Sequence, residues 1–356
     1  MSRRQPPWAF AQKVPSFRGA AEGCEPGTHI PEAGVYGFRA RRFAAPRNDR
    51  YLTLSVQGPA AERERAILFA GALAHKLRTR STNRFKVGIA MATGEQLPNA
   101  VLRQVAWRDL VALTPAEVAR ELALPLPWLA ASLAAAACGL YPLALAFSFV
   151  FFLAGLRIVH GACHYALGLS RRPTEIVLFV LSLVMLGSMH AVQWNHLRHH
   201  RRCLATDDIE AVGARGSARR AILLGPIFPV RLHRAALAGA RGRERRWMLA
   251  ELVGNLAVVG LVVGVLPEPV LLYHLSAMAV GQCLTAFFAV WTVHHDCAEA
   301  VPPARTIRHP VRSIITFNMF FHLEHHLFPQ IPTAHLPVLA RRLDATVPRG
   351  RWLLVW

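Results

Sequence analysis

The chain has 356 residues, enough for two soluble domains or for one membrane domain with a tail. Apolar residues make up 53% of it and charged residues only 17%, which is unusual for a soluble protein, yet 41 Lys and Arg against 21 Asp and Glu give a net charge of +20. The six cysteines are scattered and form no C-x-x-C pair, which excludes a cysteine-ligated iron–sulfur cluster within the chain.

Residues 1–105 form the first region, which is rich in Arg, Pro and Gly and has no long periodic segment. We expect a basic N-terminal extension that is poorly ordered, with a small independent domain as the alternative. No nucleic-acid-binding motif accompanies the basic charge, so no nucleic-acid partner is expected. Ser2-Arg3-Arg4 is followed by no apolar stretch and is not read as an export signal. A chain beginning at Met91 would keep every motif described below, so Met91 is an alternative start.

Residues 106–356 alternate between long apolar stretches and Arg-rich segments. The segment from Thr114 to Glu117 signals a helix start, with Thr as N-cap, Pro next and Glu at the third position. Four predicted membrane spans follow, at about residues 122–140, 143–160, 247–266 and 270–293. The join between the first two and the join between the last two carry no Lys or Arg. Each pair is therefore read as a helical hairpin that crosses the membrane and returns.

A fifth apolar run, about residues 175–189, is short for a span and is predicted to be a re-entrant or interfacial helix. Arg-rich segments precede the first span, separate the second from the third (Arg198 to Arg246), and follow the fourth. By the positive-inside rule, both termini and the central loop lie in the cytosol. The expected fold is an all-α integral membrane domain, with four transmembrane helices in two hairpins and a cytosolic helical cap.

Three histidine boxes fall at the cytosolic side of these elements. Histidines three or four residues apart share one face of a helix, so each box presents its imidazoles in one direction. Neutral imidazole is a common ligand of zinc, copper, iron and nickel. The eight box histidines exceed the four ligands of a tetrahedral zinc site and suit two metal ions. The boxes are H-G-A-C-H (His160, His164), H-L-R-H-H (His196, His199, His200) and H-L-E-H-H (His322, His325, His326).

These boxes, in this order, and the L-F-P-Q-I-P-T-A-H-L after the third resemble the membrane fatty acid desaturase and hydroxylase superfamily. The resemblance extends from about Trp107 to the C-terminus. It implies two non-haem irons held by the boxes, dioxygen as oxidant, and an acyl-lipid, acyl-CoA or acyl-ACP substrate that receives a C=C bond. The chain has no cysteine cluster and no H-P-G-G of the cytochrome b5 type. Electrons are therefore expected from an external donor of the ferredoxin, rubredoxin or cytochrome b5 type.

The resemblance also implies a further ligand between the second and third boxes. His294 and His295 lie at the end of the fourth span, and one of the two is expected to ligate, with the choice left open. Asn318, four residues before His322, is a candidate that acts through a water or in a supporting role, and His190 is another. Metal-bound histidines commonly donate their second N–H to a carboxylate. The carboxylates near the boxes are Asp207, Asp208, Asp296 and Glu324.

The other histidines and the basic cap have simpler interpretations. His274 lies mid-span, where an ionisable residue is a functional candidate or a hydrogen-bond partner across helices. The Arg-rich cap suits an anionic headgroup, a CoA phosphate or an acyl carrier protein, or serves membrane topology alone. The histidines expected at the surface are His29, His75, His233, His309 and His335.

Two alternative functions stay open from the sequence. A hydroxylase or ketolase of the same superfamily shares the first hydrogen abstraction, so the boxes do not distinguish it from a desaturase. A non-catalytic metal transporter would place its ligands near the bilayer midplane rather than at one membrane face. The H-L-E of the third box lacks the P-C-x-x-C of zinc deaminases, and the H-E-x-x-H of zinc proteases does not occur.

Overall fold

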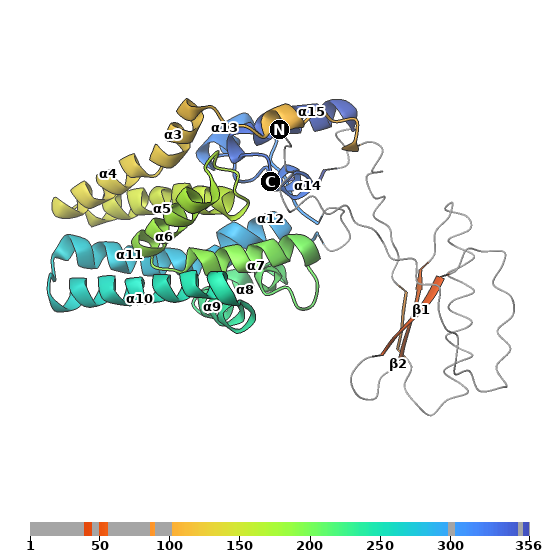
Figure 1. The fold of residues 1–356 in the computed structure, drawn as a ribbon, viewed down its shortest axis with the longest axis horizontal. Coiled ribbons are helices and arrows are strands. Elements are labelled where there is room, and N and C mark those ends of the chain that lie inside the picture. Colours follow the sequence, from red (N-terminus) through yellow and green to blue (C-terminus); the bar gives the residue numbers. More distant parts are fainter. Residues whose placement is uncertain are drawn as a thin grey trace, which may run out of the picture. The chain divides into compact units, whose positions relative to one another are not determined.

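The computed structural model describes residues 102–297, 303–347 and 352–355, together with the backbone of three short strands nearer the N-terminus (Figure 1). The chain divides into two compact units, Met1–Ala92 and Thr93–Trp356. The boundary expected near residue 105 falls inside the second unit.

The described part of the first unit is a three-stranded sheet with the order β1-β2-β3. None of these strands is expected from the sequence pattern. β1 (Arg39–Ala44) pairs antiparallel with β2 (Arg50–Ser55), and β2 pairs parallel with β3 (Lys86–Ile89). Three expectations lie outside the described residues: the disorder of the extension, the start at Met91, and the surface positions of His29 and His75.

The described part of the second unit is helical, apart from an isolated bridge between Thr306 and Leu354. As the sequence predicts, Thr114 caps α3 (Pro115–Ala123) and forms a capping box with Glu117. In chain order the elements are η1 (Arg108–Leu110), α3 (Pro115–Ala123), α4 (Leu126–Ala137), α5 (Tyr141–Cys163), α6 (Arg171–Met185), α7 (Met189–Arg202), η2 (Glu210–Ala214), α8 (Ala218–Leu224), α9 (Phe228–Gly239), α10 (Gly242–Gly264), α11 (Pro269–Thr285), the π-helical η3 (Ala286–Trp291), α12 (Thr292–His294), α13 (Pro310–Ile315), α14 (His322–Leu327), η4 (Thr333–His335) and α15 (Leu336–Thr346).

Three of the described helices are long and apolar enough to cross a membrane. They are α5 and α10, with 23 residues each, and the continuous helix formed by α11, η3 and α12, with 26 residues. The expected first span, residues 122–140, is instead divided between the end of α3 and the 12-residue α4. Pro125 and Pro127 explain the division, because proline begins a new helix more readily than it continues one. α4 alone measures about 18 Å, short of the roughly 30 Å of a hydrocarbon core.

The long helices form two layers that are joined by polar contacts. Figure 1 shows α4 beside α5 and α10 beside α11, and α6 contacts both α5 and α10. The hydroxyl of Ser148 on α5 lies 2.7 Å from that of Ser132 on α4 and 2.8 Å from that of Tyr273 on α11. Hydrogen bonds of this kind join helices in an environment where lipid offers none. They hold α5, which ends in the first histidine box, against α4 and α11.

α6 and α7 meet at an angle of 114°, a bend that suits the predicted re-entrant element. Non-helical backbone at membrane depth is tolerated only where protein groups satisfy its hydrogen bonds. Two side chains of α11 do so: His274 Nε2 donates to the Val184 carbonyl at 2.9 Å, and Gln282 Nε2 donates to the Met185 carbonyl at 2.7 Å. The intramembrane His274 therefore serves as a hydrogen-bond partner across helices.

Glu251 of α10 holds the start of α7, the helix that carries the second box. Its carboxylate accepts hydrogen bonds from Ser188 Oγ at 2.6 Å, from the His190 backbone N–H at 3.1 Å and from His190 Nδ1 at 2.7 Å. Ser188 Oγ in turn accepts from the Ala191 N–H at 3.1 Å and caps the helix. The direction of α7 is thus set by a fully buried carboxylate on a neighbouring span.

Two histidines expected at the surface are half-buried and hydrogen-bonded to distant segments. His233 Nε2 accepts from the Ser188 N–H at 2.8 Å, and His335 Nδ1 donates to the Leu110 carbonyl at 2.8 Å. The expectation is wrong for both, because each contact joins segments that are far apart in the sequence. His309 is exposed, as expected.

Replacing Gln282 by Leu leaves the Met185 carbonyl without its donor and lowers the free energy of unfolding by about 1–2 kcal/mol. Thermal unfolding in detergent measures the loss. Ser276→Ala on the same helix is the matched control, since the Ser276 hydroxyl is exposed and bonds the Leu272 carbonyl of its own helix. Equal unfolding temperatures for the two variants would contradict the role assigned to Gln282.

Candidate metal centre

The histidine boxes meet at one end of the long helices. Box one closes α5, box two lies on α7, and box three forms most of α14, while His294 ends α12. The imidazoles fall into two groups of four, and within each group the ligand nitrogens lie within 4.8 Å of one another. The first group is His160, His164, His196 and His325, and the second is His199, His294, His322 and His326.

His200 adjoins the first group and links it to the second. Its Nε2 lies 3.2 Å from that of His196 and 2.9 Å from that of His325. Its ring also stacks on that of His326, with centroids 4.2 Å apart. Boxes two and three therefore each contribute to both groups, and the nine imidazoles form one continuous cluster.

Two carboxylates anchor the outward nitrogens of box two. His199 Nδ1 donates to Asp208 at 2.7 Å, and His196 Nδ1 donates to Glu210 at 3.0 Å. With the proton on Nδ1, each Nε2 presents its lone pair to the cluster. Metal-binding histidines are commonly oriented in this way by a carboxylate.

The Asp208 carboxylate is itself held in place by the backbone. It accepts hydrogen bonds from the N–H groups of Leu204 at 3.1 Å and Ala211 at 3.2 Å. Burial alone would raise the pKa of Asp208, but the hydrogen bonds and the charge of His199 lower it below its usual value. Asp208 is therefore an ionised acceptor, whereas burial raises the pKa of Glu210.

His294 and its neighbour His295 point in different directions. His294 belongs to the second group, and its Nδ1 donates to the Pro303 carbonyl at 2.7 Å. His295 stacks on Trp291 with ring centroids 4.0 Å apart, and its Nδ1 donates to the Trp291 carbonyl at 2.8 Å, outside both groups. The π-helical η3 directly precedes α12, and such segments are frequent at functional sites. The structure thus brings His294 to the cluster and leaves His295 outside it.

The donor set fits metal ions. The buried Nε2 atoms of His160 and His164 have no hydrogen-bond partner among the described residues. His322 Nε2 lies 2.9 Å from His294 Nε2 and 3.1 Å from His326 Nε2. Two nitrogens bound at right angles to one metal, each about 2.1 Å from it, are about 3 Å apart. The spacing of the rings is therefore that of ligands sharing a metal.

The protonation state of box three agrees with this fit. Burial, followed by the charges of neighbouring imidazoles, lowers the pKa of His322, His325 and His326 well below the usual value. All three side chains are therefore neutral at physiological pH. Their lone pairs are available to a metal cation, which requires the neutral form of imidazole.

Only one of the four carboxylates expected beside the boxes bonds a histidine of the cluster, and that one is Asp208. Glu324 is buried and also accepts a hydrogen bond from Thr306 Oγ1 at 2.6 Å, so it fixes α14 rather than a ring. The expectation for the other three is corrected because arginines compete for them. The pairs are Asp207 with Arg202 (2.5 Å), Asp296 with Arg305 (3.9 Å) and Glu324 with Arg308 (2.6 Å).

His190 and Asn318 have structural contacts of their own. His190 bonds Glu251, and its ring stacks on that of Trp247 with centroids 5.1 Å apart, outside both groups. Asn318 has φ near +60°, and its N–H donates to the Ser313 carbonyl at 2.7 Å. Asn318 thus belongs to the turn before α14, and its role at a metal stays a prediction.

Two residues that position the cluster are missed by the search for boxes. Glu210 bonds His196 across fourteen residues, and a survey of every acid in the loop after box two would have found it. Arg157, on the same helix as box one, forms a buried ion pair with Glu121, with Nε to Oε2 at 2.8 Å, and donates to the Phe317 carbonyl before box three. Arg157 could have been identified from the sequence as a charged residue within the predicted span of residues 143–160.

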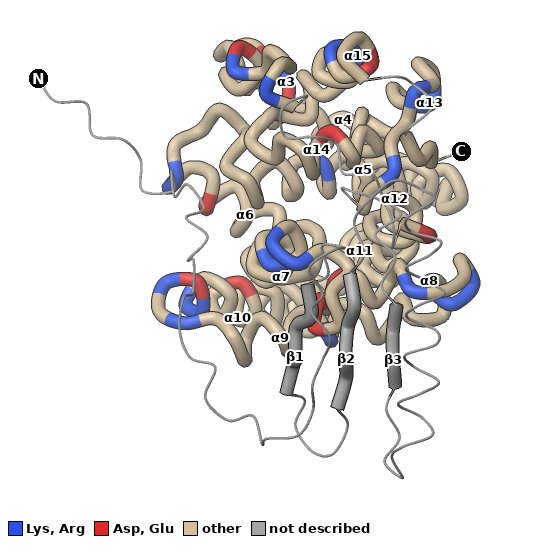
Figure 2. Tube along the Cα trace, turned by 90° about the vertical axis from the view of Figure 1, so that its right-hand side faces the viewer, with Lys and Arg blue, Asp and Glu red and all other residues tan. Residues whose placement is uncertain are grey.

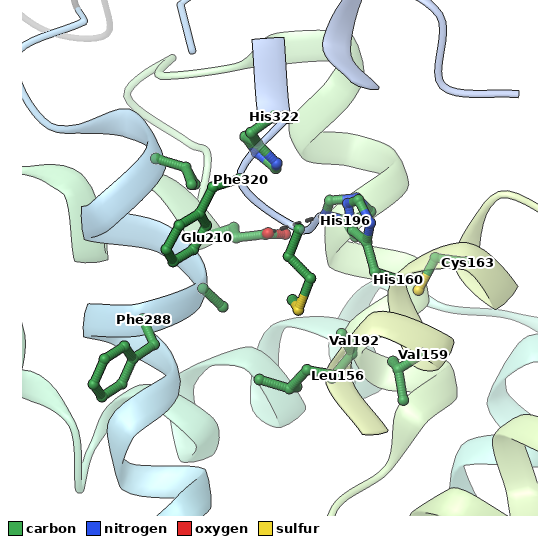
Figure 3. A pocket seen from close by; sticks show the side chains of 13 residues that line it. Leu156, Val159, His160, Cys163, Val192, His196, Glu210, Phe288, Phe320 and His322 are labelled. Atoms are coloured by element: carbon green, nitrogen blue, oxygen red, sulfur yellow. Dashed lines mark hydrogen bonds and ion pairs between the residues drawn. The ribbon is translucent and has the colours of Figure 1, made fainter. Parts of the chain in front are cut away.

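A cavity of about 70 Å³ adjoins the cluster (Figure 3). His160, His196 and His322 lie along it together with Glu210. Most of the residues around it are apolar, which suits an apolar substrate. Its apolar lining includes Leu156, Val159, Val192, Phe288 and Phe320.

Residues 99–356 match the sequence profile of the fatty acid desaturase family. The chain belongs to the fatty acid desaturase family. No curated protein matches it. The resemblance carried by the three boxes is therefore confirmed. This desaturase-family protein is a membrane oxidoreductase that acts on lipids, and its family uses iron.

Replacing Glu210 by Ala removes the acceptor of His196 Nδ1, and metal affinity is expected to fall by roughly 10–100-fold, the usual effect of losing such a partner. Competition with a chelator of known affinity measures the change. Glu244→Ala on α10 is the control, because Glu244 is exposed and lies away from the histidine groups. An affinity that is unchanged in the Glu210 variant would contradict the orienting role.

Proposed function

We propose that this protein binds two irons and uses dioxygen to introduce a C=C bond into acyl chains. The observation that carries the proposal is the division of nine imidazoles into two adjoining groups. Each group offers four or five imidazole nitrogens, which suits one iron and leaves coordination positions open for dioxygen. The cavity beside the histidines supports an apolar substrate.

The proposed ligands follow the two groups. His200 is assigned to the first iron because its Nε2 contacts two members of that group. His294 is assigned to the second, and His295 is not a ligand in this proposal. Asn318 is retained as a residue that would act through a water. The first iron is held by His160, His164, His196, His200 and His325, and the second by His199, His294, His322 and His326.

Iron at both groups would supply the activation of dioxygen that removal of hydrogen from an unactivated C–H bond requires. The residues of the chain prepare that reaction. Asp208 and Glu210 keep the protons of His199 and His196 on Nδ1, so both Nε2 lone pairs stay directed inward. The apolar walls of the cavity exclude water and hold the substrate chain, which we propose enters from the bilayer. Electrons come from an external donor protein.

Hydroxylation or ketone formation by the same centre is the alternative, since these reactions share the first hydrogen abstraction. Metal transport is disfavoured by the position of the histidines. Transporters place their sites near the bilayer midplane at broken helices. Here box one and His294 lie at the ends of α5 and α12.

We also propose that the cluster and both termini face the cytosol. Figure 2 looks at the cluster end of the helices and shows Lys and Arg on α7, α8 and α10. The joins at the far end, residues 138–140 and 265–268, carry no Lys or Arg. A reporter fused after Trp356 should therefore be active only in the cytosol. Activity on the far side of the membrane would overturn this topology.

The purified protein should hold about two irons per chain, one for each group of histidines. His294→Ala is expected to lower the content to about one or less and to abolish turnover, because it removes a nitrogen from the second group. His295→Ala is the adjacent control and should keep both metal and turnover. Metal analysis of the two variants checks the assignment, and the opposite pattern would reverse it.

Product analysis under ¹⁸O₂ separates the two candidate reactions. Iron-loaded protein in lipid vesicles, given a reductant and an acyl substrate, should yield an alkene that carries no label, since both oxygen atoms leave as water. A hydroxylase would instead yield an alcohol that carries the label. A labelled alcohol as the sole product would replace desaturation by hydroxylation.

A further inference from the structure

α7 carries a second surface on the side opposite the histidines. Trp194 and Arg198, one turn apart, share its outer face, whereas box two faces the cluster. A groove of about 310 Å³ lies along the outer face, between α7 and α9, and extends to Asp207 and Asp208. The cavity that adjoins the cluster meets α7 at Val192 and His196 instead, so the two hollows do not share a wall residue.

Close packing fixes the shape of this groove. A Cβ at Gly239 would approach the Trp194 indole to 2.3 Å, so glycine is what lets the ring lie against α9. The Arg198 guanidinium lies over the same ring, 4.6 Å from its centroid. Asn195 Nδ2 donates to the Leu232 carbonyl at 3.0 Å and ties α7 to α9. The groove is therefore shaped before any partner arrives, which lowers the entropic cost of binding.

Positive charge at the groove is left unpaired by the fold. Arg198 is exposed and has no ion pair with the residues that the structure describes. Arg231 and Arg234 of α9 are also exposed, and within the described ranges neither forms an ion pair. By helical spacing they share the face of Ala235 and Ala238, which line the groove. The surface is suited to carboxylates brought by another molecule.

A single hydrogen bond connects the groove to the histidine cluster. Asp208 lines the groove and accepts from His199 Nδ1 at 2.7 Å. The outer and inner faces of α7 are separated by one helix diameter, about 10 Å. The Arg202–Asp207 ion pair lies beside this connection and supplies no net charge. A molecule seated in the groove is thus close to the metal ligands without entering the substrate cavity.

Resting on the proposed function, which needs electrons from outside, we propose that this groove docks the acidic surface of a small one-electron carrier protein. Each docking oxidises the carrier by one electron, which passes to the metal centre. Exposed guanidinium groups attract carboxylates over about 8 Å at physiological ionic strength and favour fast, salt-sensitive encounters. Trp194 and Arg198 are also the side-chain types that dominate protein–protein contacts. An anionic lipid headgroup is the competing occupant.

The test uses iron-loaded protein in vesicles, a lipid substrate, dioxygen, and a reduced plant-type [2Fe–2S] ferredoxin as the acidic carrier. Arg198→Glu and Arg234→Glu should each raise the ferredoxin concentration for half-maximal turnover by about tenfold or more at low salt. Dithionite in place of ferredoxin should restore their turnover. Arg341→Glu on α15, an exposed site away from the groove, is the matched control and should stay within about twofold of the wild type.

Four results would overturn the docking site. One is an unchanged ferredoxin dependence in both groove variants, and another is an equal loss of turnover with dithionite, which would place the defect in the centre itself. The third is a change only in the response to vesicles with anionic phosphatidylglycerol, which would make the groove a headgroup site. A wild-type protein that turns over with dithionite and does not oxidise ferredoxin also counts against it. Absence of product with either reductant would instead overturn the proposed function.

Discussion

The structure depends on holding nine imidazoles so that their ring nitrogens face one another. Lone pairs that face each other at about 3 Å do not attract, so the rings must be held from outside the cluster. Asp208 and Glu210 do this for box two by accepting the outward protons, and the Pro303 carbonyl does it for His294. α7 is in turn held by Glu251 of α10, and α14 by the contacts of Glu324 with Thr306 and Arg308. Without these outer contacts, the apolar helices would pack but the nitrogens would not converge.

The re-entrant bend between α6 and α7 is what lets one helix serve both groups. It carries α7 across the ends of the long helices, so box two meets α5 on one side and α12 and α14 on the other. The bend is stable because Gln282 of α11 bonds the Met185 carbonyl before it and Glu251 of α10 bonds Ser188 after it. The packing of the long helices therefore determines the geometry of the metal site, because a shift of α10 or α11 would move α7.

The sequence predicted the features of the fold and of the metal site that depend on residues close together in the chain. Spacing of three and four residues put each box on one helix face, and apolar length located three long helices. The division of the boxes into two groups depends on how α7 and α14 cross, which spacing does not encode. His294 was indistinguishable from His295 because the π-helical η3 has no sequence signature. The contact of Glu210 with His196 crosses a loop, which no local pattern encodes, whereas Pro125 marks the break before α4 in the sequence itself.

The long helices differ in length from the membrane they cross. The helix from Pro269 to His294 measures about 39 Å, and a hydrocarbon core about 30 Å. Because α5 and α12 both end in the same histidine cluster, neither can slide along the membrane normal without the other. Hydrophobic mismatch must then be absorbed by tilt and by the opposite ends, at residues 138–140 and 265–268. The cluster thus fixes the position of these helix ends along the membrane normal, and a thicker or thinner bilayer is accommodated at the far hairpin joins.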